Sequence, residues 1–583
     1  MLKRIRVFLL AFPVALAAVA LPDLRSTEIV KGDLGAKLDE YLTRITPFGF
    51  SGALLVAKGD DIVLNKGYGL AIRSGGIPNT AETIFCVGSV TKQFTAAAIM
   101  SLEMQGKLST ADPISKYLDS VPEDKSGITI HHLLTHSSGL VQDVGGDYQQ
   151  ALRDETVRKI LAQPLEFKPG ERFTYTNVGY SLLAAIVEKV SGQPFEEYLY
   201  EHLFKPAGME WTGYRRPDWK RKVVAHWYVG EKDNDNSLSR PFPYWNLLGN
   251  GGILSTTEDM YKWHQALLGE KVLSVEAKKK IFTPYLNDYG YGWDVLKTEK
   301  GLLIQHDGGS GLGNNAEIRR YIDAGIVTIL FCNQFYKGRP LFNVIRDKIE
   351  NLAFGKEVAI PPAVKESEEK ALKIYEGIYA LPKGGSFKVE ARNRELLVKP
   401  EGQEAVNILI LPEGSDVSYY AGISELSARI FDAAVKGDFN PFGEAMANRE
   451  RRFERVKELV ERRVKMSQER IGAVQKVKAW ETLPSSFEEG AVETQVELQA
   501  ERGSIFFQLI WQGDKNIGLR PLEFAQPLSI TFLPLSHTEF AGYDLALARN
   551  MKVSFIFDEK GVTKSCVIHG PEKKSEAVKI TNG

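Results

Sequence analysis

The stretch "FCVGSVTKQFTAAAIM", residues 85–100, combines a turn of small residues with an amphipathic helical pattern. Ser89 and Lys92 stand where the helical pattern begins. Residues i and i+3 of a helix share one face, with Cβ atoms about 5–6 Å apart. A lysine can take the proton of a serine hydroxyl only when burial or nearby positive charge disfavours its ammonium form. The spacing fits covalent acyl transfer, and it also fits a helix-capping serine followed by a surface lysine.

A second pair of candidate residues lies in "FKPGERFTYTNVGYSLLAAIVEKVSG", residues 167–192. Tyr175 and Asn177 are two residues apart, so in an extended segment both side chains point the same way. The phenol could shuttle a proton, and the amide could bind a substrate amide or hold Lys92. A core tyrosine followed by a helix-capping asparagine is the alternative interpretation.

A third candidate segment is "LLIQHDGGSGLGNN", residues 302–315, where a predicted strand runs into glycines. His306 shares a strand face with Ile304, and Gly308 and Gly309 leave room for a substrate backbone to approach the strand edge. A loop histidine in a glycine-rich turn is the alternative. The glycine order does not match the G-x-G-x-x-G dinucleotide fingerprint.

In this order, the three segments resemble the three motifs of the serine β-lactamase and penicillin-binding protein superfamily, of which S-x-x-K is one. The Tyr-x-Asn form is similar to the branch of class C β-lactamases, D-peptidases and esterases. The resemblance covers roughly residues 40–350 and includes "ITIHHLLTHSSGL" (128–140) and "NGGILSTTEDMYKW" (250–263). It implies an α/β fold with a mostly antiparallel sheet flanked by helices, a helical lobe, and an active site in the cleft between them.

The resemblance also implies a role for each candidate residue. Ser89 would be the acylated nucleophile, Lys92 and Tyr175 would share the general acid–base work, and the backbone N–H groups of Ser89 and Gly309 would form the oxyanion hole. The residues implied in substrate binding are Asn177, His306, Gly308 and Gly309. No cofactor or metal is implied. His132 and His136 stand four residues apart, but "HLLTH" lacks the glutamate of a H-E-x-x-H zinc motif.

The third motif departs from the β-lactamase pattern, because Lys-Thr-Gly is replaced by His306-Asp307-Gly308. A histidine is mostly neutral near pH 7 and is a poorer partner for a substrate carboxylate. The His-x-Gly form resembles D-aminopeptidases and esterases, so we expect a serine hydrolase acting on esters or on D-amino-acid amides and peptides. A β-lactamase or D,D-carboxypeptidase is one alternative. A catalytically inactive envelope-binding or sensory protein is the other.

The N-terminus predicts export. Residues 1–20 combine three basic residues, an apolar run and an Ala-x-Ala cleavage site, which is typical of a secretory signal peptide. We therefore expect a periplasmic or secreted protein with no stable membrane span in the mature chain. The balance of 73 Lys and Arg against 74 Asp and Glu gives no hint of a nucleic-acid partner. The expected partner is a small-molecule or short-peptide substrate, and the oligomeric state stays open.

The C-terminal part predicts a different architecture. Residues 24–355 are the expected hydrolase domain, and a linker over 356–368 contains Pro361-Pro362 and a charge run. Alternating strand–turn–strand patterns fill much of 369–583 and resemble a lipocalin-like β-barrel. A helical insert is expected at about 418–482, and glutamates between its arginines indicate a solvated helix face.

Overall fold

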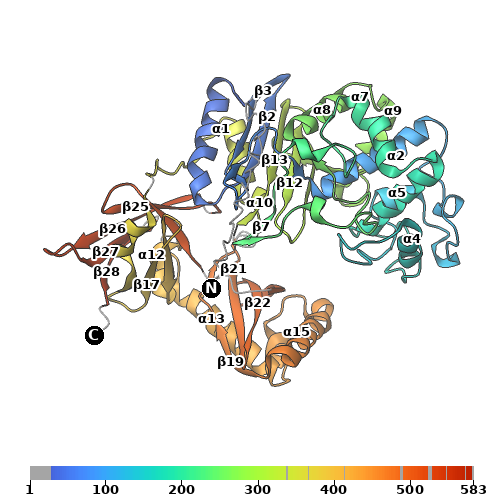
Figure 1. Cartoon of the computed structure of the whole chain (residues 1–583). Helices are drawn as coiled ribbons and strands as arrows, with labels where there is room; N and C mark the ends of the chain where they lie inside the picture. The colour runs from blue at the N-terminus through green and yellow to red at the C-terminus, as the bar shows by residue number, and fades with distance from the viewer. Residues whose placement is uncertain are drawn as a thin grey trace, which may run out of the picture.

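The structure of the chain is a computed structural model. It describes residues 28–336, 339–365, 367–412, 414–485, 490–522, 528–546, 548–570 and 573–580. The predicted signal peptide, residues 1–20, lies outside the described residues. The described chain forms an α/β unit, a closed β-barrel and a smaller module of helices and strands (Figure 1).

A seven-stranded antiparallel sheet in the order β1-β3-β2-β13-β12-β11-β10 forms the centre of the α/β unit. Strands from the two ends of the unit meet where Leu55 of β2 pairs with Ile329 of β13. Figure 1 shows the blue N-terminal strands beside the later yellow-green ones, so the sheet is built from both ends of this unit. The strands are β1 (Ile29–Val30), β2 (Gly52–Lys58), β3 (Asp61–Tyr68), β10 (Asp294–Thr298), β11 (Gly301–Gly309), β12 (Asn315–Tyr321) and β13 (Ile326–Cys332).

Both faces of this sheet are buried, which explains the uninterrupted apolar sequence of β2. Successive strand residues point to opposite faces. Leu54 and Val56 pack with α1 (Gly32–Ile45) and α10 (Leu341–Ala353), whereas Leu55 faces the core of the helical lobe. The other helices of the unit are α2 (Lys92–Met104), α3 (Ile130–Leu134), α4 (Arg153–Leu161), α5 (Asn177–Ser191), α6 (Phe195–Leu199), α7 (Lys205–Ala207), α8 (Thr257–Leu268) and α9 (Val275–Ile281). This arrangement confirms the expected fold class.

Eight antiparallel strands close into the C-terminal barrel, as expected for a β-rich C-terminal domain. Its interior is filled by side chains such as Phe387, Val398, Phe532 and Phe555, all buried in one cluster. A specific likeness to lipocalins stays a prediction. The strands are β16 (Gly377–Ala380), β17 (Ser386–Arg392), β18 (Glu395–Glu401), β24 (Ile530–Pro534), β25 (Glu539–Asp544), β26 (Arg549–Phe557), β27 (Thr563–His569) and β28 (Lys574–Lys579).

The insertion between β18 and β24 contains strands as well as the expected helices. Helix α15 ends at Ile471, where Gly472 has a φ of 86°, and the following residues pair with β21 instead of continuing the helix. Phe507 and Trp511 of β22 join a core with the helices of the insertion, so its hairpins do not belong to the barrel. The elements are α12 (Gln403–Leu409), α13 (Val417–Val435), α14 (Asn440–Ala445), α15 (Arg449–Ile471), β19 (Val474–Ala479), β20 (Leu483–Pro484), β21 (Val492–Ala500), β22 (Gly503–Gln512) and β23 (Lys515–Leu522).

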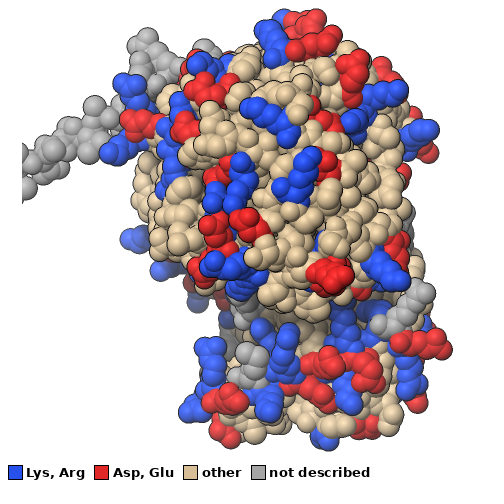
Figure 2. All heavy atoms as spheres, turned by 90° about the vertical axis from the view of Figure 1, so that its right-hand side faces the viewer, with Lys and Arg blue, Asp and Glu red and all other residues tan. Residues whose placement is uncertain are grey.

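The surface carries both signs of charge. Figure 2 shows Lys and Arg interspersed with Asp and Glu over the face that it presents. Within the described ranges, no helix is long and apolar enough to cross a lipid bilayer. The three cysteines, Cys86, Cys332 and Cys566, are buried free thiols. Packed apolar cores therefore carry the stability of the described chain.

Candidate active site

Ser89 lies where a short strand turns into a helix. Strand β6 (Phe85–Cys86) pairs with β9 (Leu254–Ser255), and a 3-10 turn over Gly88–Thr91 then leads into α2. Gly88 has a φ of 53°, and a Cβ at Gly88 would lie 2.4 Å from the Gly309 nitrogen. Both the turn and the close approach of β11 therefore require a glycine at this position.

Lys92 is completely buried beside Ser89. Its Nζ lies 3.0 Å from Ser89 Oγ, and it donates hydrogen bonds to Asn177 Oδ1 and to the backbone oxygen of Asn250, each at 2.9 Å. Burial lowers the pKa of Lys92 to about 7, although the charges of Asp143 and Asp147 oppose this shift. The amine is thus held by three contacts and is available in its neutral form near neutral pH.

Tyr175 and Asn177 approach the same pair from the start of α5. Asn177 is the first residue of this helix, and its Nδ2 donates to Asp143 Oδ1 at 2.8 Å while its Oδ1 accepts from Lys92. The Tyr175 ring centre lies 4.7 Å from Lys92 Nζ. Burial raises the pKa of Tyr175, while a hydrogen bond with Ser89 opposes that shift. Both side chains therefore lie beside Lys92, although Asn177 is already helical and the segment is not extended throughout.

His306 is not among the residues that line the Ser89 cleft; it lies behind them, with its ring centre 6.4 Å from that of Tyr175 and only 4% of its surface exposed. Its Nε2 is 3.0 Å from the hydroxyl of Tyr289, and its Nδ1 is 2.6 Å from the backbone oxygen of Asp307. Burial, together with the charge of Lys92, lowers the pKa of His306 to about 3. The imidazole is therefore neutral, and both ring nitrogens are engaged inside the protein.

The glycines of β11 bring two backbone amides close to the nucleophile. A Cβ at Gly308 would lie 2.3 Å from the Ser89 nitrogen, so the strand and the turn are in direct backbone contact. Together with the approach of Gly88 to the Gly309 nitrogen, this contact places the amides of Ser89 and Gly309 side by side. A pair of adjacent N–H groups is the geometry that stabilises an oxyanion.

A cleft opens over Ser89 between the sheet and the helical lobe. Its lining brings together the S-x-x-K turn, the start of α5, the glycine end of β11, a loop at residues 147–148 and the start of the 250–263 segment. The lining residues are Gly88, Ser89, Asp147, Tyr148, Asn177, Leu247, Asn250, Gly251, Gly252, Gly309, Ser310 and Asn314.

Sequence reasoning missed two residues that hold the site together. His136 was weighed only as a metal ligand, yet its ring lies 4.3 Å from the Tyr175 ring and its Nδ1 accepts from the backbone N–H of Thr176 at 3.1 Å. Tyr289, which contacts His306, carried no motif. The available signal for His136 was its position inside the quoted family segment, residues 128–140. The described residues contain no group of three or more potential metal ligands.

A model of the protein family described as "Beta-lactamase" matches residues 47–348, over half of the chain. The chain belongs to the β-lactamase family. The matched region contains Ser89, Lys92, Tyr175, Asn177 and the β11 glycines, and it ends before the barrel. The resemblance inferred from the three motifs is therefore confirmed at the level of the family.

Some of the proteins that this chain is similar to are named or described as penicillin-binding proteins. The Bacillus subtilis protein PbpX is 38% identical over 275 residues, which cover 46% of this chain and 68% of that protein. A second Bacillus subtilis relative, named as a penicillin-binding protein, is 29% identical over 385 residues, or 61% of this chain and 84% of its own. The solved penicillin-binding protein of Bacillus halodurans is 29% identical, covers 52% of this chain and 98% of its own, and superimposes with a TM-score of 0.45.

Proposed function

We propose that this protein is an exported serine hydrolase that acts through an acyl-enzyme on esters or on D-amino-acid amides and peptides. The observation that carries the proposal is the contact between Lys92 and Ser89. A fully buried amine with a pKa of about 7 lies 3.0 Å from the serine hydroxyl. Such an amine can accept the hydroxyl proton at neutral pH, which an ordinary surface lysine cannot do.

In the proposed reaction, Ser89 Oγ attacks the substrate carbonyl carbon while Lys92 Nζ takes its proton. The carbonyl oxygen becomes an oxyanion that accepts hydrogen bonds from the N–H groups of Ser89 and Gly309. Collapse of the tetrahedral intermediate breaks the bond to the alcohol or amine, which takes the proton held by Lys92 by way of Tyr175, and the acyl group stays on Ser89. Water, deprotonated by the same machinery, then attacks the ester and releases the acid.

The base in this scheme is Lys92 rather than Tyr175. Burial raises the pKa of Tyr175, so its phenolate is costly near neutral pH. Lys92, with its lowered pKa, offers a neutral base without that cost. Tyr175, hydrogen-bonded to Ser89 and close to Lys92, is suited to relay a proton to the leaving group. Asn177 accepts a hydrogen bond from Lys92 Nζ and so keeps the amine in position beside Ser89 and Tyr175.

The charges around the cleft favour substrates that do not depend on a carboxylate for binding. His306 is neutral with both nitrogens engaged, so the third motif offers no cation there. Asp147 lines the cleft, and Asp143 is bonded to Asn177 at its edge. These carboxylates repel a substrate carboxylate and attract a substrate amine. An ester, or an amide with a free α-amino group, fits this electrostatic setting best.

A penicillin-directed function is the second candidate, because relatives are named as penicillin-binding proteins. A β-lactam carries a carboxylate, so the same electrostatics should weaken its binding and slow the acylation of Ser89. The candidate of another class, an inactive envelope-binding or sensory protein, is motivated by the C-terminal barrel and its insertion, none of whose described residues lines the Ser89 cleft. The proposed export rests on the basic and apolar N-terminal segment of residues 1–20.

Labelling of the full mature chain tests the proposal. The wild-type protein is treated separately with a fluorophosphonate and with penicillin, and its intact mass is measured. We expect one fluorophosphonate adduct on wild type and on Ser310→Ala, a serine variant in the same cleft, and none on Ser89→Ala. An adduct on Ser89→Ala would refute the proposal. A panel of esters, D- and L-amino-acid amides and chromogenic cephalosporins then ranks the substrates, and turnover of cephalosporin above every ester would favour the second candidate.

A further inference from the structure

A second cleft lies between the α/β unit and the barrel, and none of its described lining residues also lines the Ser89 cleft. Its volume is about 650 Å³. Sites for small molecules commonly measure roughly 300–1,000 Å³ and often lie between domains. Among the residues that form its walls are Phe48, Arg73, Glu231, Tyr336, Glu395 and Thr531. The cleft thus has the size and the location of a ligand site.

The wall from the α/β unit is held in place by hydrogen bonds. Arg73 Nη1 donates to the backbone oxygen of Gly230 at 2.7 Å, and its guanidinium stacks 4.0 Å from the Tyr228 ring centre. The Arg73 side chain also bonds to Gln334, whose Nε2 donates to the backbone oxygen of Gly49 at 2.6 Å. These contacts fix the wall before any ligand arrives, which lowers the entropy that binding must overcome.

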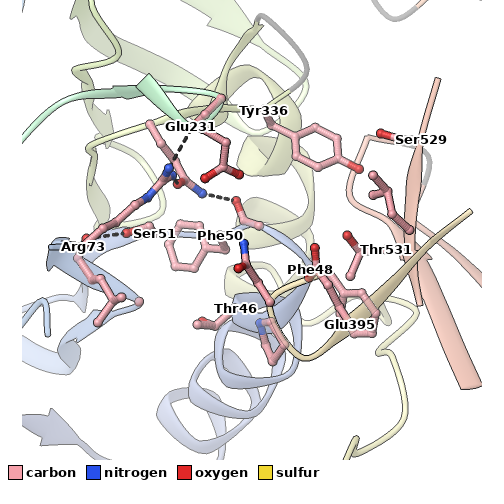
Figure 3. A pocket seen from close by; sticks show the side chains of 18 of the residues that line it. Thr46, Phe48, Phe50, Ser51, Arg73, Glu231, Tyr336, Glu395, Ser529 and Thr531 are labelled. Atoms are coloured by element: carbon pink, nitrogen blue, oxygen red, sulfur yellow. Dashed lines mark hydrogen bonds between the residues drawn. The ribbon is translucent and has the colours of Figure 1, made fainter. Parts of the chain in front are cut away.

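Two carboxylates from different domains stand on opposite walls. Glu231 lies in the turn between β7 (Tyr228–Val229) and β8 (Lys232–Asp233), and Glu395 is the first residue of β18. Figure 3 shows Glu231 on one side of the cleft, with Glu395 and Thr531 on the other. Burial, followed by the charge of Glu231, raises the pKa of Glu395 to about 7. The two charges are therefore close enough to disfavour each other.

A cation between the two carboxylates would relieve this repulsion. An ammonium group has three hydrogen-bond donors and no acceptor, so it matches a wall of carboxylates and hydroxyls. The Thr531 hydroxyl stands beside Glu395, and the Tyr336 ring borders the same space. Aromatic faces attract cations as well. Arg73 and Arg392 also line the cleft, and their charges act on Glu231 and Glu395 respectively. The Arg73 guanidinium is already bonded to Gly230 and Gln334, so an ammonium group would add donors between the two carboxylates, whereas a neutral ligand would leave their repulsion in place.

We propose that the cleft between the α/β unit and the barrel binds a small molecule with a primary ammonium group, held between Glu231 and Glu395. Because its walls come from both domains, the ligand would also tie the barrel to the α/β unit. This proposed amine site does not depend on catalysis at Ser89. A negative result for amine binding therefore leaves the proposed hydrolase function untouched, and the reverse also holds.

Titration calorimetry with 2-phenylethylamine tests this site on the full mature chain. The neutral 2-phenylethanol serves as the matched probe, and pH 8 keeps Glu395 ionised. We expect one saturable amine site and no binding of the alcohol. Losing a charged hydrogen-bond partner should weaken amine binding about ten- to hundred-fold in Glu395→Gln and in Glu231→Gln. Glu559→Gln, on an exposed barrel turn, should bind like wild type.

Two further variants separate this cleft from the Ser89 cleft and from misfolding. Asp147→Asn removes a carboxylate from the Ser89 cleft and should leave amine binding at the new site unchanged. Melting curves report the folding of each variant, and Glu231 is exposed in a turn, so its substitution keeps the test valid if Glu395→Gln fails to fold. The proposal is overturned if wild type shows no saturable binding, if the alcohol binds equally, or if only Asp147→Asn loses affinity.

Discussion

Replacing Asp143 by asparagine is expected to move the acid limb of the pH–rate profile to lower pH. Asp143 accepts from Asn177 Nδ2 at 2.8 Å, and Asn177 Oδ1 accepts from Lys92 Nζ at 2.9 Å, so one amide group separates the carboxylate from the amine. The charge of Asp143 raises the pKa of Lys92 against the larger, opposite effect of burial. Asparagine keeps the hydrogen-bond acceptor and removes only the charge.

The size of the shift follows from Coulomb's law. A unit charge about 7 Å away contributes roughly 0.6 kcal/mol at the dielectric constant of water and about 2.4 kcal/mol at an effective value near 20. One pKa unit corresponds to about 1.4 kcal/mol, so the expected shift lies between about 0.4 and 1.7 units. Asp143 is exposed, and solvent screening favours the lower end, near about half a unit.

The assay is kcat/KM for a neutral ester between pH 5 and 9, with product measured by chromatography so that the readout does not titrate. Only the neutral amine accepts the serine proton, so kcat/KM should rise with pH through the pKa of Lys92, about 7 in wild type. Asp143→Asn should move that midpoint down, and Glu559→Gln should not move it. An unchanged or higher midpoint in a folded, active Asp143→Asn protein would refute the assignment of Lys92 as the base.

Two other substitutions test the packing around the site. Gly308→Ala places a Cβ 2.3 Å from the Ser89 nitrogen, so β11 must move and kcat/KM for the ester should fall at least about a hundredfold; a loss below about tenfold would contradict this. Arg346→Met leaves the buried Glu317 carboxylate, now 2.6 Å from Arg346 Nε, without its partner, which should lower the free energy of unfolding by about 3–5 kcal/mol in urea titrations. Lys205→Met, at an exposed helix pair, should change it little.

The sequence predicted the parts of the fold that depend on local patterns. The helical pattern of residues 85–100 was enough to predict helix α2, and the run into the glycines of residues 302–315 was enough to predict strand β11. The i, i+3 spacing of Ser89 and Lys92 predicted a contact between them, and their side chains lie 3.0 Å apart. Tyr175 and Asn177, two residues apart, both lie beside Lys92. These features are readable because they depend on residues close together in the chain.

Contacts between segments that are distant in the chain could not be predicted from the sequence in the same way. The third partner of Lys92 is a backbone oxygen, that of Asn250, and a backbone oxygen leaves no mark on the residue type. The insertion was read as helical because the arginine- and glutamate-rich α15 dominates its composition. Its strands were assigned to the barrel, since a period-two pattern shows that a strand is half-buried but not which sheet it joins.

Burial affects the charge that the third motif carries more than the replacement of lysine by histidine does. From the sequence, His306 differed from a lysine in being a weaker cation at the cleft. In the structure it is enclosed by Tyr289 and the Asp307 backbone, so it contributes no charge at neutral pH. The same desolvation brings the pKa of Lys92 to about 7. One physical cause thus accounts for the proposed catalytic base and for the missing cation that a substrate carboxylate would need, which links the proposed acyl transfer at Ser89 to the proposed preference for esters and amine-bearing amides.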